Sequence, residues 1–237
     1  MKRYKLAIFD LDGTLLNTLY DLADSTNFAL AACGFPERTV GEVRQFVGNG
    51  VRKLIERAVP PETDAAVVEK TLAAFKAHYA EHCEDKTEPY DGIIPLLDKL
   101  IEKGIAVAVV SNKIDSAVSS LCKKYFSERI PISVGDREGK RKKPAPDTIF
   151  EVLNTLKIAK EDAIYIGDSE VDIETAKNAG MDCISVTWGF RDMDVLLRTW
   201  GIEYASDSSN SLKQGVFCEN ISVHFADTPE EIEKILL

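Results

Sequence analysis

The stretch KLAIFDLDGTLL, residues 5–16, runs from apolar residues into two aspartates, Asp10 and Asp12, and then into the turn residue Gly13. Its apolar part predicts a short buried strand. Two carboxylates beyond that strand, with only Leu11 between them, are costly unless a cation or a proton relieves their repulsion. Mg²⁺ accepts oxygen ligands and typically completes its shell with substrate phosphate. The stretch therefore predicts a strand that ends at a magnesium and phosphate site.

Two other interpretations of the aspartate pair explain less. A calcium EF-hand loop needs its glycine at the sixth loop position, whereas Gly13 stands at the fourth position counted from Asp10. A capped junction between a strand and a turn would use the same residues without a ligand. The ends of the other predicted strands favour the metal site.

Short apolar segments rich in β-branched residues recur along the chain, each followed by a turn and a helical pattern: residues 105–111, 132–135, 163–168 and 183–189. This alternation predicts an α/β fold with a doubly wound parallel sheet. Ligands of such sheets bind at the carboxyl ends of the strands. The residues expected there are Asp10, Ser111, Gly135, Asp136, Asp168 and Thr187.

The segment between the first two strands has a different pattern. Apolar residues at spacings of three and four fill residues 18–35, 40–59 and 64–83, and no run there is typical of a strand. We expect an α/β core domain of residues 1–14 and 91–237 and an inserted helical cap domain of residues 15–90. The cap is predicted to be a bundle that acts as a lid over the strand ends.

The tail departs from the alternation. Residues 200–224 hold the polar run SDSSNS between two β-prone runs, IEYA and VFCENISVHF. A last helix is expected with Thr228 as N-cap, Pro229 at its first position and Glu231 closing a capping box.

Composition limits the partners and the location. The net charge of −10 and the isoelectric point near 4.9 argue against nucleic acid as a partner. The 5 cysteines are scattered, without a C-x-x-C motif, which favours a reducing cytoplasm over a disulfide framework. Asp10 ends the first apolar run too early for a signal peptide, and no run is long enough to span a membrane.

Other strand ends add polar groups suited to phosphate chemistry. Asp168 follows one predicted strand, and Asp172 comes one helical turn later on the same face. Ser111 offers a hydroxyl beside the free N–H groups of a loop that leads to a helix. Lys143 precedes Pro144, whose ring favours an extended backbone at the lysine. An ammonium held in this way can neutralise an anion during transfer.

Together the motifs DLDGT, VVSNK, the Lys143-Pro144 pair and GDSEVD resemble the haloacid dehalogenase superfamily of aspartyl-phosphate phosphatases, in family order and over nearly the whole chain. Within it, GNGVRKLIERAV and SVTWGFRD resemble the phosphoglycolate phosphatases. Asn17 and Thr18 depart from that group, which often has Asp and Ser there, and residues 200–224 look longer than its usual link.

The resemblance implies a role for each motif residue of this chain. The roles are Asp10 as nucleophile and Asp12 as general acid and base; Ser111, Asn112 and Lys143 as substrate-binding residues; and Asp10, the Asp12 backbone carbonyl and Asp168 as ligands of Mg²⁺, with Asp172 in support. The implied function is a Mg²⁺-dependent phosphatase of a small phosphorylated metabolite, with 2-phosphoglycolate the first candidate, working as a monomer or homodimer.

Alternatives remain within this resemblance. A dehalogenase is disfavoured because those members lack a second aspartate two residues after the nucleophile. An inorganic pyrophosphatase or a phosphosugar mutase of the β-phosphoglucomutase kind would share the same strand-end residues. A non-catalytic regulatory protein is disfavoured because every reactive position is filled.

Basic and metal-binding side chains of the insert have their own interpretations. Arg52 or Lys53, after the turn GNG, could meet a substrate carboxylate or could simply be solvated on a helix. His78, His82 and Cys83 are spaced for one helix face but lack a third ligand of a known motif, so a solvated helix is expected there.

Overall fold

The computed structural model describes residues 4–199, 216–218 and 221–237. The chain divides into two compact units, one of Met1–Leu15 with Pro89–Leu237 and one of Leu16–Glu88. The first unit is built on a 7-stranded sheet with the order β5-β4-β1-β6-β7-β9-β8. The strands are β1 (Leu6–Phe9), β4 (Ala106–Ile114), β5 (Ile132–Asp136), β6 (Ala163–Gly167), β7 (Asp182–Val186), β8 (Val216–Cys218) and β9 (Ile221–Ala226).

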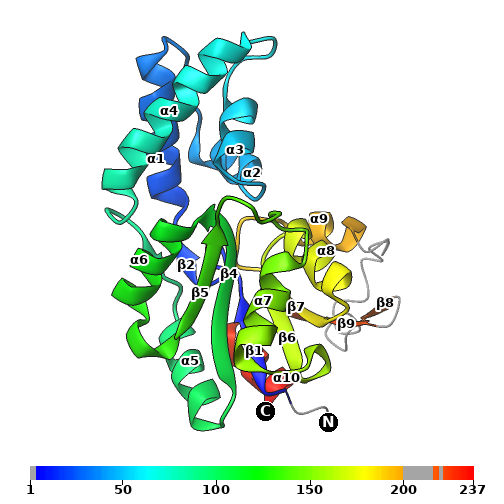
Figure 1. The fold of residues 1–237 in the computed structure, drawn as a ribbon. Helices are drawn as coiled ribbons and strands as arrows, with labels where there is room; N and C mark the ends of the chain where they lie inside the picture. Colours follow the sequence, from blue (N-terminus) through cyan, green and yellow to red (C-terminus); the bar gives the residue numbers. More distant parts are fainter. Residues whose placement is uncertain (1–3, 200–215, 219–220) are drawn as a thin grey trace. The chain divides into compact units, whose positions relative to one another are not determined.

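All neighbouring strands of this sheet are parallel except β8 and β9, which are antiparallel. Every residue of β1, β6 and β7 is buried, as expected for a parallel sheet covered on both faces. From β1 the chain adds β4 and β5 on one side and then returns to add β6, β7 and β9 on the other. The prediction of a doubly wound parallel sheet is confirmed, and its strand order reverses at β1 (Figure 1).

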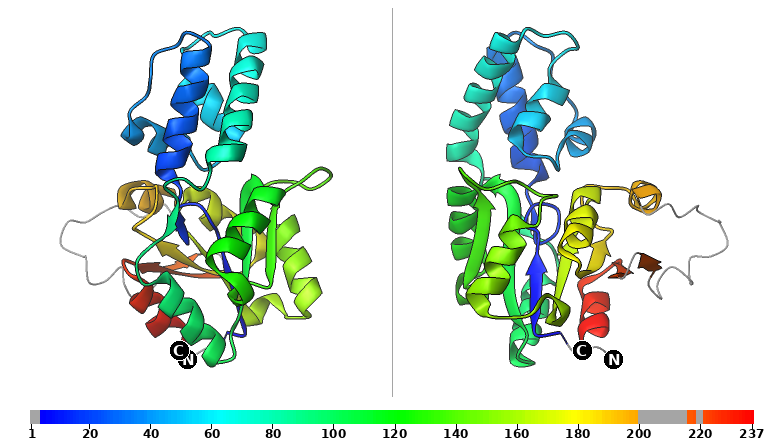
Figure 2. Two further views of the ribbon diagram at one scale, coloured as in Figure 1. Left: turned by 90° about the vertical axis from the view of Figure 1, so that its left-hand side faces the viewer. Right: turned by 45° about the vertical axis from the view of Figure 1, so that its right-hand side comes forward.

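Helices cover both faces of the sheet (Figures 1 and 2). Apolar residues of α7, α8 and α9 pack in one core with Leu6, Ile8 and Tyr165 of the sheet. On the opposite face lie α5, α6 and α10, and α5 packs against both α10 and β4. The bounds are α5 (Ile93–Glu102), α6 (Asp115–Tyr125), α7 (Asp147–Leu156), α8 (Glu170–Ala179), α9 (Met193–Thr199) and α10 (Pro229–Leu236), with 3-10 turns at Ser127–Arg129 and Lys160–Asp162.

The described part of the tail completes the sheet. The run VFCENISVHF contains both β8 and β9, whereas IEYA and SDSSNS lie outside the described residues. Helix α10 begins as predicted, with Thr228 as N-cap and Pro229 in its first turn. The predicted capping box is wrong, because the Glu231 carboxylate accepts from the N–H of Asp227 at 2.7 Å instead.

The unit of residues 16–88 has its own apolar core, centred on Leu30, Ile55 and Phe75. Its helices are α1 (Leu19–Ala32), α2 (Val40–Phe46), α3 (Val51–Ala58) and α4 (Ala65–His82). The helical pattern over 40–59 is divided between α2 and α3, because Gly48 and Gly50 have φ angles of 121° and 83°. Two short strands, β2 (Leu16–Asn17) and β3 (Glu88–Pro89), pair with each other, which the pattern of the insert did not predict.

Helices long and apolar enough to cross a membrane are absent from the described residues.

The absence of a side chain at Gly135 allows β5 to approach the end of β4. A Cβ at this position would lie 2.5 Å from the Cα of Asp115 and 2.6 Å from the carbonyl oxygen of Lys113. Because both neighbours are backbone atoms, we expect Gly135→Ala to lower the free energy of unfolding, measured in urea, by about 1–3 kcal/mol. Gly41→Ala is the control, since nothing lies within 4 Å of that Cβ. Equal stabilities of Gly135→Ala and the wild type would show that β5 moves aside without cost.

Candidate active site

Asp10 directly follows β1 at the point where the strand order reverses. Phe9 pairs with Val109 of β4 and Ile166 of β6, so the residues after these three positions meet at one edge of the sheet. The Asp10 N–H donates to the carbonyl of Ile166 at 2.8 Å, which extends the ladder by one residue. Its carboxylate is almost fully buried, and Oδ1 accepts from the N–H of Leu11 at 2.7 Å.

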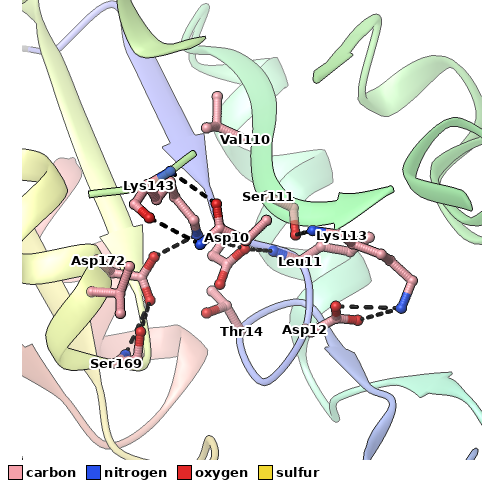
Figure 3. A network of polar contacts seen from close by, with 12 residues as sticks. Asp10, Leu11, Asp12, Thr14, Val110, Ser111, Lys113, Lys143, Ser169 and Asp172 are labelled. Carbon is pink, nitrogen blue, oxygen red and sulfur yellow. Dashed lines mark hydrogen bonds and ion pairs between the residues drawn. The ribbon is translucent and has the colours of Figure 1, made fainter. Parts of the chain in front are cut away.

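The ammonium of Lys143 is the cation that faces Asp10. Its Nζ lies 2.9 Å from Asp10 Oδ1 and 2.7 Å from Asp172 Oδ1 (Figure 3). It also donates to the Tyr165 hydroxyl at 3.0 Å. The Lys143 side chain is only 3% exposed. The sequence thus correctly suggested that this lysine lies with the aspartates at the strand ends.

The Asn112 side chain holds the backbone of Lys143. Its Nδ2 donates to the Lys143 carbonyl at 3.1 Å, and its Oδ1 accepts from the Lys143 N–H at 2.9 Å. Sequence reasoning placed Asn112 among the residues that bind substrate. Both polar groups of its side chain contact the Lys143 backbone, and the expected contact of Asn112 with substrate stays a prediction.

Asp168 and Asp172 join Asp10 in one buried group. One carboxylate oxygen from each of the three aspartates lies within 4.8 Å of one oxygen of each of the other two. Asp168 Oδ2 accepts from the N–H of Phe190 at 2.7 Å, and its Oδ1 accepts from the Thr14 hydroxyl at 3.3 Å.

Asp172 stands in the first turn of α8 and is completely buried. Beyond the Lys143 contact, it accepts from the Tyr165 hydroxyl at 3.0 Å and from the N–H and Oγ of Ser169 at 3.1 and 2.6 Å. These four donors fix its position. The sequence predicted that Asp172 would face this edge, but not that it would share Lys143 with Asp10.

Glycines make room for two of the three carboxylates, those of Asp168 and Asp172. A Cβ at Gly13 would lie 2.4 Å from Asp168 Oδ2, one at Gly189 2.3 Å from Asp168 Cβ, and one at Gly167 2.3 Å from Asp172 Cγ. Gly13 also has a φ of 85°, which favours glycine. Sequence reasoning recognised Gly13 as a turn residue, but no spacing in the sequence identified the contact of Gly189.

Burial makes this group electrostatically costly without a cation. Desolvation raises the pKa of Asp10 to about 7; the Lys143 ammonium opposes the rise, and the carboxylates of Asp172 and Asp12 add to it. Desolvation, and then the charges of Asp172 and Asp10, also raise the pKa of Asp168 well above its ordinary value. Burial lowers the pKa of Lys143, but Asp10 and Asp172 outweigh it, so the net direction is upward and the lysine stays charged. These residues fit a hard divalent cation, which accepts carboxylate oxygens.

The charge argument from the sequence needs a correction at Asp12. Its carboxylate does not crowd the acidic group but pairs with Lys113, whose Nζ lies 3.0 Å from Oδ1 and 3.3 Å from Oδ2. The repulsion that a cation would relieve is therefore mainly among Asp10, Asp168 and Asp172. The Asp12 contribution expected at the metal is its backbone carbonyl, which stays a prediction.

Of the other residues expected at the strand ends, Ser111 lies beside the buried carboxylates, whereas Asp136 and Thr187 form contacts with other residues. Ser111 is buried on β4 next to Asp10, and its Oγ accepts from the N–H of Lys113 at 3.3 Å (Figure 3). Asp136 pairs with Lys142 at 2.6 Å, and the Thr187 hydroxyl donates to Asp227 Oδ1 at 2.8 Å.

The carboxylate group predicts a link between pH, metal and stability. A carboxyl with a raised pKa in the folded state stabilises the fold below its unfolded pKa, and that contribution is lost as the pH rises through the folded pKa. For Asp10 this window runs from 3.8 to about 7. Without metal we expect Tm to fall across this range, and we expect Mg²⁺ to raise Tm more at pH 8 than at pH 5.

Differential scanning fluorimetry of the full chain measures this effect. Asp168→Asn should abolish the Mg²⁺-dependent rise, whereas Asp162→Asn, which changes a surface carboxylate paired with Lys5, should keep it. A Tm that does not change when Mg²⁺ is added, at either pH, would contradict a metal site at these residues.

Comparison with known proteins agrees with the motifs and the geometry. Residues 7–186 match the family model of haloacid dehalogenase-like hydrolases. Phosphoglycolate phosphatase of Agrobacterium fabrum is 37% identical over 202 residues, covering 81% of this chain and 84% of the relative. N-acetylmuramic acid 6-phosphate phosphatase of Pseudomonas aeruginosa is 31% identical over 211 residues, covering 89% and 93%.

A solved structure supports the same assignment over the full length. The crystal structure of a Lactobacillus delbrueckii subsp. bulgaricus protein, described provisionally as a phosphoglycolate phosphatase, aligns with a TM-score of 0.86 and 33% identity, covering 99% of both chains. The predicted resemblance is confirmed: the chain belongs to the haloacid dehalogenase-like hydrolases and within them is similar to the phosphoglycolate phosphatases.

Proposed function

We propose that this enzyme is a Mg²⁺-dependent phosphatase that hydrolyses a small phosphorylated metabolite through an aspartyl phosphate on Asp10, with 2-phosphoglycolate as the first candidate substrate. The observation that carries the proposal is the buried Asp10 carboxylate, held by the Lys143 ammonium beside Asp168 and Asp172. The phosphatase names of its relatives support it.

The contacts of Asp10 suit a nucleophile. The donors to its carboxylate among the described residues, Leu11 N–H and Lys143 Nζ, both bind Oδ1. Oδ2 is then the oxygen that attacks phosphorus, which forms the acyl phosphate and breaks the bond to the leaving oxygen. Lys143 neutralises charge on the phosphoryl group, and the Ser111 hydroxyl is placed to donate to its oxygens.

Asp12 completes both half-reactions. It gives a proton to the leaving oxygen in the first and takes one from the attacking water in the second, which releases phosphate and restores Asp10. A divalent cation held by Asp10, Asp168 and the Asp12 carbonyl, supported by Asp172, would stabilise negative charge on the phosphoryl oxygens.

The substrate is selected outside this group of residues. We propose that residues 16–88 act as a cap that contacts the leaving group, as the insert pattern suggests. Within that unit Arg52 pairs with Glu69 at 2.5 Å, and Lys53 with Glu56 at 2.6 Å. These exposed pairs are typical of a solvated helix face, so they favour that interpretation over recognition of a substrate carboxylate. We further propose a cytoplasmic monomer or homodimer.

Turnover of a substrate panel tests the function. The panel holds p-nitrophenyl phosphate, 2-phosphoglycolate, N-acetylmuramic acid 6-phosphate, pyrophosphate and β-glucose 1-phosphate, with kcat/KM measured for each. EDTA should abolish turnover, and added Mg²⁺ should restore it. A preference for pyrophosphate, or isomerisation of the phosphosugar, would replace the proposed function with one of the two alternatives, and no turnover of any compound would overturn it.

Asp10→Asn is predicted to fold but to lose at least 90% of kcat, since an amide cannot form the acyl phosphate. Rapid acid quench with ³²P-labelled substrate should trap phosphoprotein in the wild type and none in the variant. Asp162→Asn, at an exposed position, controls for the loss of one carboxylate. Normal phosphoprotein in Asp10→Asn would assign the nucleophile to another residue.

Lys143→Ala is predicted to lower kcat and raise KM together, because its ammonium faces the phosphoryl group and is nearly inaccessible to water. Lys140 and Lys142 are matched controls from the same run, with side chains 43% and 47% exposed and paired with Glu151 and Asp136. Their alanine variants should stay within about threefold of the wild type, as expected for exposed ion pairs. Equal losses in all three variants would mean that the run acts as a diffuse positive field.

A further inference from the structure

Lys113 is a second buried lysine beside the reacting residues, and sequence reasoning assigned it no role. Its Nζ is within hydrogen-bond distance of both oxygens of Asp12 (3.0 and 3.3 Å), and its side chain is 4% exposed against 17% for Asp12. In Figure 3 this pair lies on one side of Asp10, and Lys143 with Asp172 lies on the other. The Lys113 ammonium is therefore buried, and the Asp12 carboxylate that it contacts is the more exposed member of the pair.

The backbone around Lys113 is fixed from several directions. Strand β4 continues past Ser111 to Ile114, and its register with β5 shifts between Val110 and Ile114. The Lys113 N–H donates to Ser111 Oγ at 3.3 Å, and the next turn is held by Asp115 Oδ1, which accepts from the Gly135 N–H at 2.7 Å. Lys113 therefore reaches Asp12 from a rigid part of the sheet.

We propose that Lys113 is a positioning residue that holds the Asp12 side chain where its protonated form can give a proton to the leaving oxygen of a substrate bound at Asp10. The inference rests on the proposed phosphatase function and adds the residue that positions its general acid. Asp12 lies beyond the end of β1, in the turn that Gly13 completes, so its side chain needs an outside partner to fix it. Misplacement of a reacting group by about 1 Å can cost on the order of 100-fold in rate.

The cost of burial supports a specific role for this lysine. Placing an ammonium in the interior carries a desolvation penalty, and apolar residues of similar volume often replace buried ion pairs without loss of stability. A lysine at this position is thus a poor choice for packing alone. Its contact with both oxygens of one carboxylate is what positioning that carboxylate requires.

The test uses the dependence on the leaving group. Nitrophenolate leaves without needing a proton, whereas an alkoxide needs one. A correctly positioned general acid therefore speeds the hydrolysis of alkyl phosphates much more than that of p-nitrophenyl phosphate. We expect Lys113→Met to lower kcat/KM by roughly 10- to 100-fold on ethyl phosphate and on 2-phosphoglycolate, and by less than about threefold on p-nitrophenyl phosphate. Lys113→Arg should recover part of the loss. Lys99→Met, which removes an exposed lysine paired with Glu233, is the control expected to resemble the wild type.

A double-mutant cycle separates positioning from other roles. Asp12→Asn should show the same dependence on the leaving group, and adding Lys113→Met to it should cause no further loss, because the lysine acts through Asp12. Independent, multiplying losses in the double variant would overturn the proposal. If Lys113→Met does not fold, as judged by its Tm, Lys113→Gln, whose uncharged side chain is one bond shorter than that of lysine, carries the same comparison.

The substrate pattern distinguishes the other outcomes. An equal loss on all three compounds would mean that Lys113 acts on the phosphoryl group, and a loss confined to 2-phosphoglycolate would mean that it binds the substrate carboxylate; either result overturns positioning. A wild type inactive on every phosphate ester with Mg²⁺ present would instead refute the proposed function itself. Failure of the function and failure of the inference are therefore distinguishable.

Discussion

The pairing of one buried ammonium with two buried carboxylates is the constraint around which this active site is arranged. Lys143 Nζ contacts Asp10 at 2.9 Å and Asp172 at 2.7 Å in a region with almost no access to water. Such a pair persists only if geometry and further hydrogen bonds compensate for lost hydration. Tyr165 and Ser169 supply those bonds at Asp172, and Asn112 fixes the lysine backbone. The need to keep Lys143 and Asp172 in place thus explains the contacts of Tyr165, Ser169 and Asn112.

The lysine does not balance the charge of the group completely. Asp168 adds a third carboxylate, and its donors, Phe190 N–H and the Thr14 hydroxyl, are neutral. The raised pKa of both Asp10 and Asp168 reflects this excess of negative charge. The proposed nucleophile must be ionised to attack, and a second positive charge would favour that ionised form at neutral pH. The electrostatics of the site therefore support the proposed divalent cation.

The sequence predicted which residues would lie together at the ends of the strands. It did not predict the contacts that depend on side-chain conformation. Asp10, Ser111 and Asp168 follow buried strands, and the carboxyl ends of parallel strands meet at one edge, so their proximity could be predicted. Lys143 comes from a loop, and its motif rather than any periodicity identified it. The contacts of Asn112 with the Lys143 backbone could not be predicted, because only the side-chain conformation shows which backbone groups an amide binds.

Other misses have the same physical origin. Lys113 lies on β4 past the expected end of that strand, where its register with β5 shifts, and the sequence did not indicate that its side chain would contact Asp12. The pattern over 40–59 follows helical periodicity, but positive φ angles at Gly48 and Gly50 interrupt the backbone while the periodicity continues. Periodicity describes which side chains are apolar. It does not report backbone angles or the partners of polar groups.

The separate positions of the two buried lysines help to explain how the same reacting residues can occur in phosphatases with different substrates. Lys143 and Lys113 lie on opposite sides of Asp10, and in the proposed mechanism Lys143 acts at the phosphoryl group and Lys113 at the general acid. Among alkyl phosphates, all of which release an alkoxide that needs a proton, neither task depends on which alcohol leaves. Relatives named for a two-carbon acid phosphate and for an amino-sugar phosphate are 37% and 31% identical to this chain, which is expected if the reacting group is indifferent to the alcohol. Discrimination between alcohols must then come from residues that contact the parts of the leaving group beyond its oxygen, and these would be residues other than the two lysines and their carboxylates.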